Sequence, residues 1–241
     1  MSDKPSVRSP WFWVPSLYFA QGIPYVAVMI VSVLMYKRLG VSNTDIALYT
    51  SWLNLPWVIK PFWSPFVDLL KTKRWWVATM QLLIGAGLAG VAFTIPTTFF
   101  FQASLAVFWL LAFSSATHDI AADGFYMLAL DSHEQAFFVG IRSTFYRIAI
   151  IAGQGVLVMF AGFLENSTGN IPLAWSVTFF ILGGLFLALF LYHRYILPLP
   201  KGDKPSATVT PSTILKEFFA TFASFFKKKQ AFVAILFMLL Y

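Results

Sequence analysis

Six apolar stretches, each long enough to cross a lipid bilayer as an α-helix, occupy most of the first 197 residues. A helix needs about 20 apolar residues to cross the hydrocarbon core. The stretches cover residues 11–36, 45–69, 75–95, 99–127, 135–163 and 173–197. A seventh begins near residue 230 and reaches the last residue, Tyr241, after too few residues to cross. The pattern predicts an all-α integral membrane fold with six spanning helices plus the start of a seventh.

The composition agrees with a membrane protein and excludes several kinds of site. Hydrophobic residues make up 59% of the chain and charged residues 11%, whereas soluble domains carry about 25% charged residues. Cysteine is absent, which excludes disulfides and cysteine-based metal or redox centres, and we expect no metal and no cofactor. The net charge of +7 could suggest nucleic acid as a partner. In a membrane protein, however, lysine and arginine mark cytoplasmic loops, so we expect a lipid bilayer and no nucleic acid.

Lysine and arginine are distributed unevenly between the loops. They gather before the first stretch, between the second and third, and after the sixth, whereas the loops on the other side hold only Lys37 and Arg38. This bias predicts a cytoplasmic N-terminus. Residues 1–197 then form a six-helix bundle, 198–229 a cytoplasmic linker, and 230–241 the start of a truncated seventh helix. Within the linker, phenylalanines at helical spacing and three lysines at its end predict an amphipathic helix on the membrane surface.

The fourth stretch carries two acids and a histidine, at positions that should lie inside the membrane. Asp119 and Asp123 are four residues apart, so they share one face of a helix, one turn from each other. Ionised groups at that depth are costly unless they face a bundle interior or a watery cavity. We therefore predict that Asp119 and Asp123 couple transport to protons, with a purely structural charge network as the alternative.

The first two stretches carry candidate solute contacts. Tyr18, Gln21 and Tyr25 lie on one helix face. They flank the sequence Gly-Ile-Pro at 22–24, which should kink or loosen the helix. We predict that this face lines a cavity, with an interfacial aromatic belt as the alternative. Lys60 lies within the second stretch, where it could bind an anion or an internal acid, or snorkel to the interface.

The fifth stretch carries two arginines. Arg147 and Gln154 share one stripe of the helix, and Arg142, five residues before Arg147, is predicted to point to a different side. We expect one arginine to pair with Asp68 or Asp119 and the other to bind the solute, and the sequence leaves open which does which. Asp68 precedes the basic turn between the second and third stretches. Asp68 and Arg142 are therefore candidates for a conformational gate.

Residues 85–90 read Gly-Ala-Gly-Leu-Ala-Gly and match the glycine pattern of dinucleotide sites. Such a site requires a preceding strand and an acid about 20 residues later, and this apolar stretch has neither. We predict that these small residues allow close helix packing instead. The chain also has no P-loop lysine motif and no HExxH motif, so the sequence gives no support to ATP-driven transport or to metalloprotease activity.

Four motifs, in chain order, resemble those of the AmpG muropeptide permeases and their acetyl-CoA transporter relatives within the major facilitator superfamily. They are Tyr-Phe-Ala-Gln-Gly-Ile-Pro-Tyr at 18–25, the proline-rich and tryptophan-rich segment 55–68, Ala-Thr-His-Asp-Ile-Ala-Ala-Asp at 116–123, and Tyr146-Arg147. Two positions depart from the pattern: Ser64 replaces the usual glycine of the loop signature that ends at Asp68, and His118 stands where glutamine is more usual. The resemblance implies the N-terminal six-helix half of a major facilitator fold, and we expect this chain to lack a C-terminal half.

The resemblance further implies secondary active, proton-driven uptake of cell-wall muropeptides, which are N-acetylglucosaminyl-anhydromuramyl peptides, across the inner (plasma) membrane. Together with the residue patterns, it gives these candidate solute-binding residues: Tyr18, Gln21, Tyr25, Lys60, His118, Arg147 and Gln154. Three alternatives remain open. They are transport of another anionic solute such as acetyl-CoA, a membrane-embedded acyltransferase that uses His118 with Asp119, and a sensor or scaffold that does not transport. We expect a transporter and not an enzyme.

Overall fold

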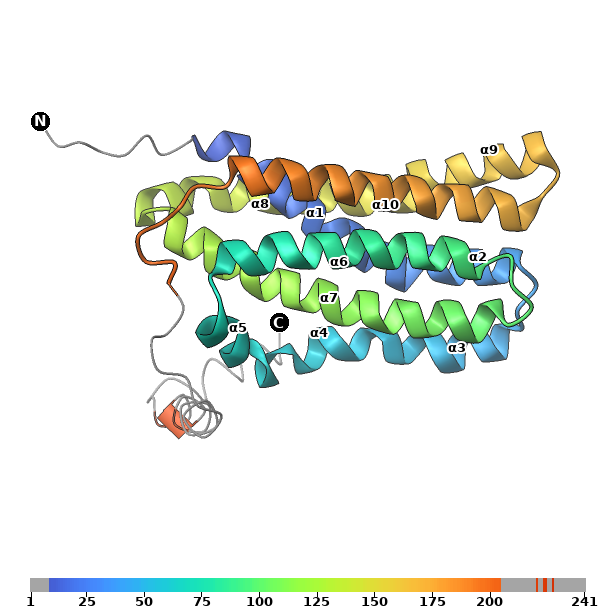
Figure 1. The fold of residues 1–241 in the computed structure, drawn as a ribbon, viewed down its shortest axis with the longest axis horizontal. Coiled ribbons are helices and arrows are strands. Elements are labelled where there is room, and N and C mark those ends of the chain that lie inside the picture. The colour runs from blue at the N-terminus through green and yellow to red at the C-terminus, as the bar shows by residue number, and fades with distance from the viewer. Residues whose placement is uncertain (1–8, 205–219, 221–222, 225–226, 228–241) are drawn as a thin grey trace, which may run out of the picture.

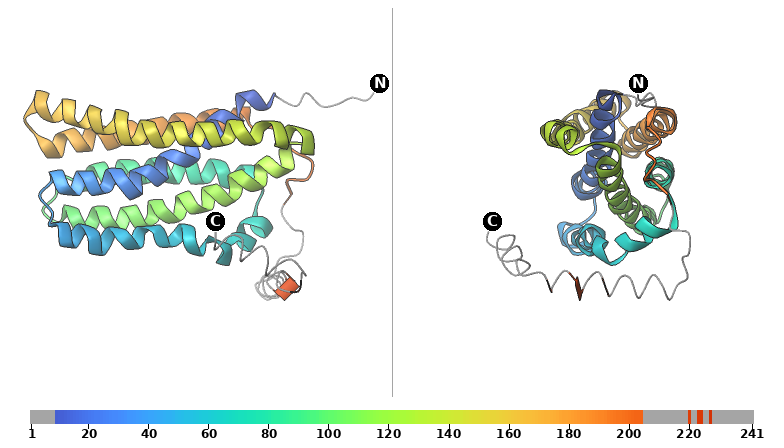
Figure 2. Two further views of the ribbon diagram at one scale, coloured as in Figure 1. Left: turned by 180° about the vertical axis from the view of Figure 1, so that it is seen from behind. Right: turned by 90° about the vertical axis from the view of Figure 1, so that its left-hand side faces the viewer.

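The computed structural model describes residues 9–204, 220, 223–224 and 227. In this part of the chain every regular element is helical, and the helices run side by side in an elongated bundle (Figures 1 and 2). The predicted linker helix falls almost wholly outside the described residues, and the predicted seventh helix falls wholly outside them.

Five long helical runs extend from one end of the bundle to the other (Figure 1). The first joins η1 (Pro10–Phe12), α1 (Val14–Val26), η2 (Ala27–Val31) and α2 (Ser32–Arg38). The others are α6 (Lys73–Thr94), α7 (Phe100–Ala129), α8 (Ser132–Ala152) with η5 (Gly153–Leu157) and α9 (Val158–Thr168), and α10 (Ile171–Ile196). Each run is long and apolar enough to cross a membrane. The all-α membrane class is thereby confirmed, and these runs correspond to five of the six predicted spans.

The predicted second span, residues 45–69, is divided into five short helical pieces rather than forming one continuous helix. Its residues form α3 (Asn43–Thr50), η3 (Ser51–Asn54), α4 (Leu55–Ile59), η4 (Lys60–Phe62) and α5 (Ser64–Leu70). Pro56, Pro61 and Pro65 stand in the first turn of the last three pieces, because a proline farther inside a helix removes a backbone hydrogen bond. α3 and α4 still run beside α7, whereas α5 turns aside at one end of the bundle (Figures 1 and 2).

Side chains that accept hydrogen bonds from backbone amides fix where four helices begin. Ser42, Thr72, Asp131 and Asn170 precede α3, α6, α8 and α10, and each accepts a bond of 2.8–3.1 Å from the amide three residues later. Each bond satisfies an amide that has no partner within the first turn of its helix. These capped turns hold the loops at the two ends of the bundle.

The first and fifth spans each contain a π-helical turn, η2 and η5, and the two spans approach closely beside these turns. η2 follows Pro24, whose missing amide interrupts the α-helical hydrogen bonds, so the predicted loosening of the first span is confirmed. η5 begins at Gly153, where an added Cβ would overlap the Val26 side chain. At Gly22 an added Cβ would lie 2.7 Å from the Cβ of Ala149. Glycine therefore allows the close approach of the first and fifth spans.

The glycine motif of residues 85–90 lies inside α6 and serves helix packing. A Cβ at Gly85 would lie 3.2 Å from the backbone oxygen of Gly183 in α10, and one at Gly87 would lie 2.7 Å from the side chain of Leu111 in α7. α6 therefore packs against two helices through its small residues. This confirms the packing interpretation over nucleotide binding.

The two ends of the bundle differ in charge. One end, called the basic end below, carries Lys71, Lys73, Arg74, Arg194 and Lys201. At the opposite end Arg38 forms an ion pair with the buried Glu165, which also accepts a 2.7 Å bond from the indole of Trp175. This arrangement ties α2, α9 and α10 together. The cytoplasmic location of the basic end stays a prediction.

Candidate functional site

α1, α7 and α8 line an open polar cavity nearer the basic end of the bundle. Its volume is about 410 Å³. It is lined by Tyr18, Gln21, Asp123, Arg142, Ser143, Tyr146 and Arg147. Three separate stretches of sequence therefore bring five of the predicted residues to one cavity, together with Ser143 and Tyr146.

Asp123 is held at this cavity by a tyrosine and an arginine. The hydroxyl of Tyr18 donates a 3.0 Å hydrogen bond to Asp123 Oδ1. Arg142 Nη1 lies 3.4 Å from the same oxygen and 3.1 Å from the Tyr18 hydroxyl. The guanidinium also lies over the rings of Tyr18 and Tyr126, at 5.0 and 5.1 Å from their centroids. These contacts satisfy the Asp123 charge and fix the plane of the guanidinium.

Asp119 lies one helical turn from Asp123 and is far less exposed. Only 7% of the residue is accessible, and its Oδ2 lies 3.8 Å from the ammonium of Lys60 in η4. The side chains of Gln21 and Trp57 contact the same carboxylate. Its other oxygen, Oδ1, is buried and has no hydrogen-bond partner among the described residues. Such an oxygen is costly when charged, and a proton bound there would remove that cost.

Gln21 connects the two acids, because it lines the cavity and also contacts Asp119. Tyr25 packs edge-on against Trp57, with ring centroids 5.2 Å apart, and does not line the cavity. Tyr18 and Gln21 therefore line the cavity as expected, whereas Tyr25 lies outside it.

The expected arginine pairings require correction. Arg142 and Arg147 both line this cavity, although their spacing on α8 predicted that they point to different sides. Neither arginine pairs with Asp68 or Asp119. The structure pairs Arg142 with Asp123 instead.

The Asp68 carboxylate is paired with Lys73 across the turn between α5 and α6. The Lys73 side chain is buried, and its methylene stem lies against Gly124 of α7, where an added Cβ would come within 2.9 Å of Lys73 Cε. Gln154 is exposed in η5 and lies outside the cavity. Asp68 and Gln154 are therefore separate from the acids of α7.

His118 also lies outside the cavity, in a buried chain of hydrogen bonds. The chain runs from His118 Nε2 to Gln81 Nε2 at 3.1 Å, from Gln81 Oε1 to His193 Nδ1 at 3.0 Å, and from His193 Nε2 to Ser16 Oγ at 2.9 Å. An amide nitrogen only donates and an amide oxygen only accepts, so His118 Nε2 accepts and His193 Nδ1 donates. The chain joins α7, α6, α10 and α1, and it takes His118 away from the position of a solute ligand.

Sequence reasoning missed Tyr126, Lys73 and the partners of His118. Tyr126 could have been found, because it lies three residues after Asp123 on the same helix face. Gln81 and His193 gave no such signal, since each lies on a different helix from His118. Among the described residues, no group of three or more histidine, aspartate or glutamate side chains is placed to hold a metal ion.

The sequence matches one protein family over most of its length. The model of the BT1 family matches residues 19–241, which include every candidate site residue except Tyr18. The chain belongs to the BT1 family. The BT1 match and the relatives below agree with the resemblance to AmpG-like transporters that the four motifs indicated.

Three curated relatives illustrate the similarity of this BT1-family chain. It is 27% identical over 234 residues to the "Putative transporter AmpG 4" of Rickettsia conorii, covering 91% of this chain and 53% of the relative. It is 24% identical over 233 residues to the anhydromuropeptide permease of Escherichia coli K12, covering 93% of this chain and 44% of the permease. It is 29% identical over 196 residues to an uncharacterized protein of Haemophilus influenzae, covering 78% of this chain and 43% of that protein. The chain spans about half the length of the curated relatives it matches.

Proposed function

We propose that this chain forms the N-terminal half of a secondary active transporter, which couples uptake of an anionic muropeptide to proton entry across the inner membrane. One observation carries the proposal: α7 holds two acids one turn apart, each beside a cation from a different helix. Asp119 lies beside Lys60, and Asp123 lies beside Arg142. Such charges inside a lipid-embedded bundle are typical of ion and substrate pathways.

The two acids have different roles in this proposal. Asp119 holds the transported proton, because it is the more buried acid and has a carboxylate oxygen without a partner among the described residues. Asp123 serves instead as an ion-pair partner, because Tyr18 donates to its Oδ1 and Arg142 lies beside the same oxygen. Gln21 contacts Asp119 and lines the cavity, so its side chain can respond both to protonation of Asp119 and to solute bound in the cavity.

The solute is anionic and carries sugar or peptide groups. Arg142 and Arg147 supply positive charge to the cavity, while Tyr18, Tyr146 and Ser143 supply hydroxyls and aromatic rings. A guanidinium has five N–H donors. The bonds from Arg142 to Tyr18 and Asp123 use only Nη1, which leaves other donors for a carboxylate of a muropeptide. The phosphates of acetyl-CoA would suit the same cations, and this solute is the second candidate.

The remaining half of the cavity is supplied by a second, C-terminal bundle, and solute binds between the two bundles near the membrane midplane. The basic end and the N-terminus face the cytoplasm, because lysine and arginine gather there. A cysteine introduced at Lys201 should resist an impermeant thiol reagent in intact cells, whereas one introduced at Ser167, at the opposite end, should react. The reverse labelling pattern would contradict this orientation.

A transport assay on the complete transporter, meaning this chain with its C-terminal half, tests the function. Energised vesicles should accumulate labelled anhydromuropeptide above the outside concentration, and an uncoupler should abolish the accumulation. Excess acetyl-CoA should not compete with the muropeptide if the solute is correctly assigned. Uptake that resists the uncoupler would contradict proton coupling, and a vesicle that takes up neither solute would favour a sensor or scaffold.

The geometry gives no support to the acyltransferase alternative. His118 is bonded to Gln81 of α6, whereas Asp119 faces Lys60 of η4. Adjacent residues of a helix point about 100° apart, so these two side chains do not form the histidine–acid pair that such an enzyme would use. Acyl transfer by the purified protein in detergent would contradict this conclusion.

A further inference from the structure

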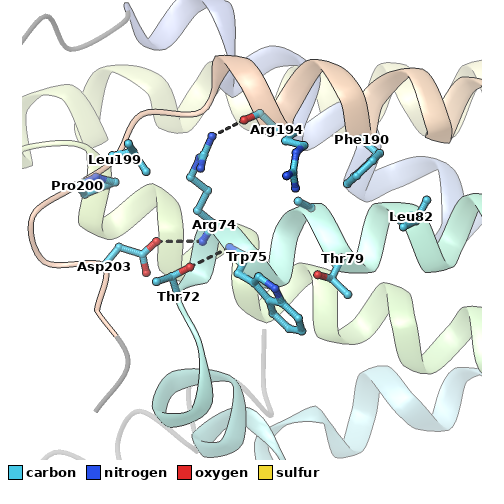
Figure 3. A pocket seen from close by; sticks show the side chains of 11 residues that line it. Thr72, Arg74, Trp75, Thr79, Leu82, Phe190, Arg194, Leu199, Pro200 and Asp203 are labelled. Carbon is cyan, nitrogen blue, oxygen red and sulfur yellow. Dashed lines mark hydrogen bonds between the residues drawn. The ribbon is translucent and has the colours of Figure 1, made fainter. Parts of the chain in front are cut away.

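A second hollow lies on the outer surface of the bundle at the basic end, between α6 and α10. Its volume is about 340 Å³. Arg74, Trp75 and Leu82 line it from α6, and Phe190 and Arg194 line it from α10 (Figure 3). Trp75 and Leu82 are 44% and 42% exposed, so this α6–α10 groove opens toward the surroundings of the bundle. It shares no residue with the polar cavity.

The rim of the groove is cationic. The Arg194 side chain points from α10 toward α6 (Figure 3). The guanidinium of Arg74 donates to the backbone carbonyl of Arg194, which holds a second positive charge at the same rim. Lys71 lies 6.0 Å from the centroid of the Trp75 ring, which adds a third cation nearby. The rim therefore attracts an anion.

Among the described residues that line the groove, the one acid, Asp203, is already engaged. The two carboxylate oxygens of Asp203 accept hydrogen bonds from the backbone amides of Lys73, at 2.6 Å, and Arg74, at 3.0 Å. Asp203 thus satisfies amides in the first turn of α6. Its charge partly offsets the arginines, but its oxygens are directed toward the helix.

The floor of the groove is apolar and continues along the bundle. Ala78 and Leu82 are four residues apart on α6, and Phe190 lies one turn before Arg194 on α10. Leu82 lies eight residues after Arg74, which is about 12 Å along the helix axis. Near the middle of the bundle the two helices come closer together, because a Cβ added at Gly85 or Gly183 would lie 3.2 or 3.0 Å from the backbone oxygen of the other glycine. The groove therefore joins a cationic rim to an apolar floor.

We propose that the α6–α10 groove binds an anionic phospholipid, with its phosphate at Arg194 and Arg74 and the first part of an acyl chain against Leu82 and Phe190. Basic pockets between membrane helices recognise anionic head groups, and tryptophan favours the membrane interface. The apolar floor distinguishes a lipid from a free phosphate, because a phosphate ion would leave Leu82 and Phe190 uncovered. The proposal depends only on insertion in a membrane and not on the transported solute.

Lipid retention by the purified 241-residue chain tests this proposal, with native mass spectrometry as the readout. Dioleoyl phosphatidylglycerol should be retained in preference to dioleoyl phosphatidylcholine. Arg194→Gln should weaken retention of phosphatidylglycerol about fivefold, the effect of one cation near an anionic head group. Lys37→Gln, which removes one positive charge at the opposite end, should leave retention unchanged. Leu82→Gln should weaken retention of the lipid while leaving the binding of inorganic phosphate unchanged.

Three results would overturn the proposal. The first is equal retention of phosphatidylglycerol by the Arg194→Gln and Lys37→Gln proteins. The second is equal retention of the anionic and zwitterionic lipids by the unchanged protein. The third is displacement of the lipid by an equal concentration of inorganic phosphate, which would reduce the groove to a phosphate site.

Discussion

Replacing Asp119 with asparagine is expected to abolish uphill, gradient-driven uptake by the complete transporter, while solute binding and exchange persist. Asparagine has nearly the same shape as aspartate but cannot take up and release a proton. The Lys60 side chain is 37% exposed, so its ammonium is not sealed within this bundle when it loses its partner. Accumulation of labelled solute in energised vesicles, measured beside exchange of preloaded solute, checks this expectation.

Asp131→Asn is the matched control for Asp119→Asn. It makes the same chemical change at the N-cap of α8, where asparagine caps as well as aspartate, so uptake should remain normal. If the acids of α7 served only as a structural charge network, Asp119→Asn would lose folded protein and solute binding together. Normal uphill accumulation by Asp119→Asn would show that this residue does not couple transport to protons.

Replacing Arg142 with glutamine is expected to weaken solute binding about tenfold, which is the lower end of the effect of a hydrogen bond to a charged group. The lower end applies because the Arg142 side chain is 32% exposed and its charge is partly screened. Of the two side chains that contact Asp123 Oδ1, Tyr18 and Arg142, this change leaves Tyr18 in place. Isothermal titration calorimetry with the complete, purified transporter measures the affinity.

Arg142→Lys separates charge from shape at this position. Lysine keeps the positive charge but lacks the planar guanidinium that lies over Tyr18 and Tyr126, so we expect an affinity between those of the unchanged protein and Arg142→Gln. Equal affinities in all three proteins would exclude Arg142 as a solute ligand. A parallel fall in melting temperature in both variants would assign Arg142 a structural role instead.

Much of the fold follows from the length and composition of the apolar stretches. Five spans lie where these stretches predicted them, because a helix that crosses a bilayer must satisfy its own backbone and present apolar side chains. The second stretch has the same apolar length, yet Pro56, Pro61 and Pro65 divide it into short pieces. Hydropathy is averaged over a window of residues, so it does not detect the loss of single backbone hydrogen bonds. The positions of the three prolines in the sequence did indicate where such bonds would be lost.

The pairings within the candidate site were predictable only where the partners are local in sequence. The shared face of Asp119 and Asp123 follows from their spacing on one helix. The angle between Arg142 and Arg147 suggested two different sides, whereas both long side chains reach one cavity. His118 is next to Asp119 in sequence, but its partners lie on α6 and α10. Such pairings depend on how the helices pack, which the spacing of residues within one helix does not encode.

The central claim is that Asp119 couples proton movement to solute movement, and solute-driven proton flux tests it most directly. Proteoliposomes that hold the complete transporter are placed in weakly buffered medium without a pH gradient, and anhydromuropeptide is added outside. The medium should become more alkaline with the unchanged protein and with Asp131→Asn, because protons enter with the solute. Asp119→Asn should give no pH change although solute still exchanges. An equal alkalinisation with Asp119→Asn would contradict proton coupling through Asp119.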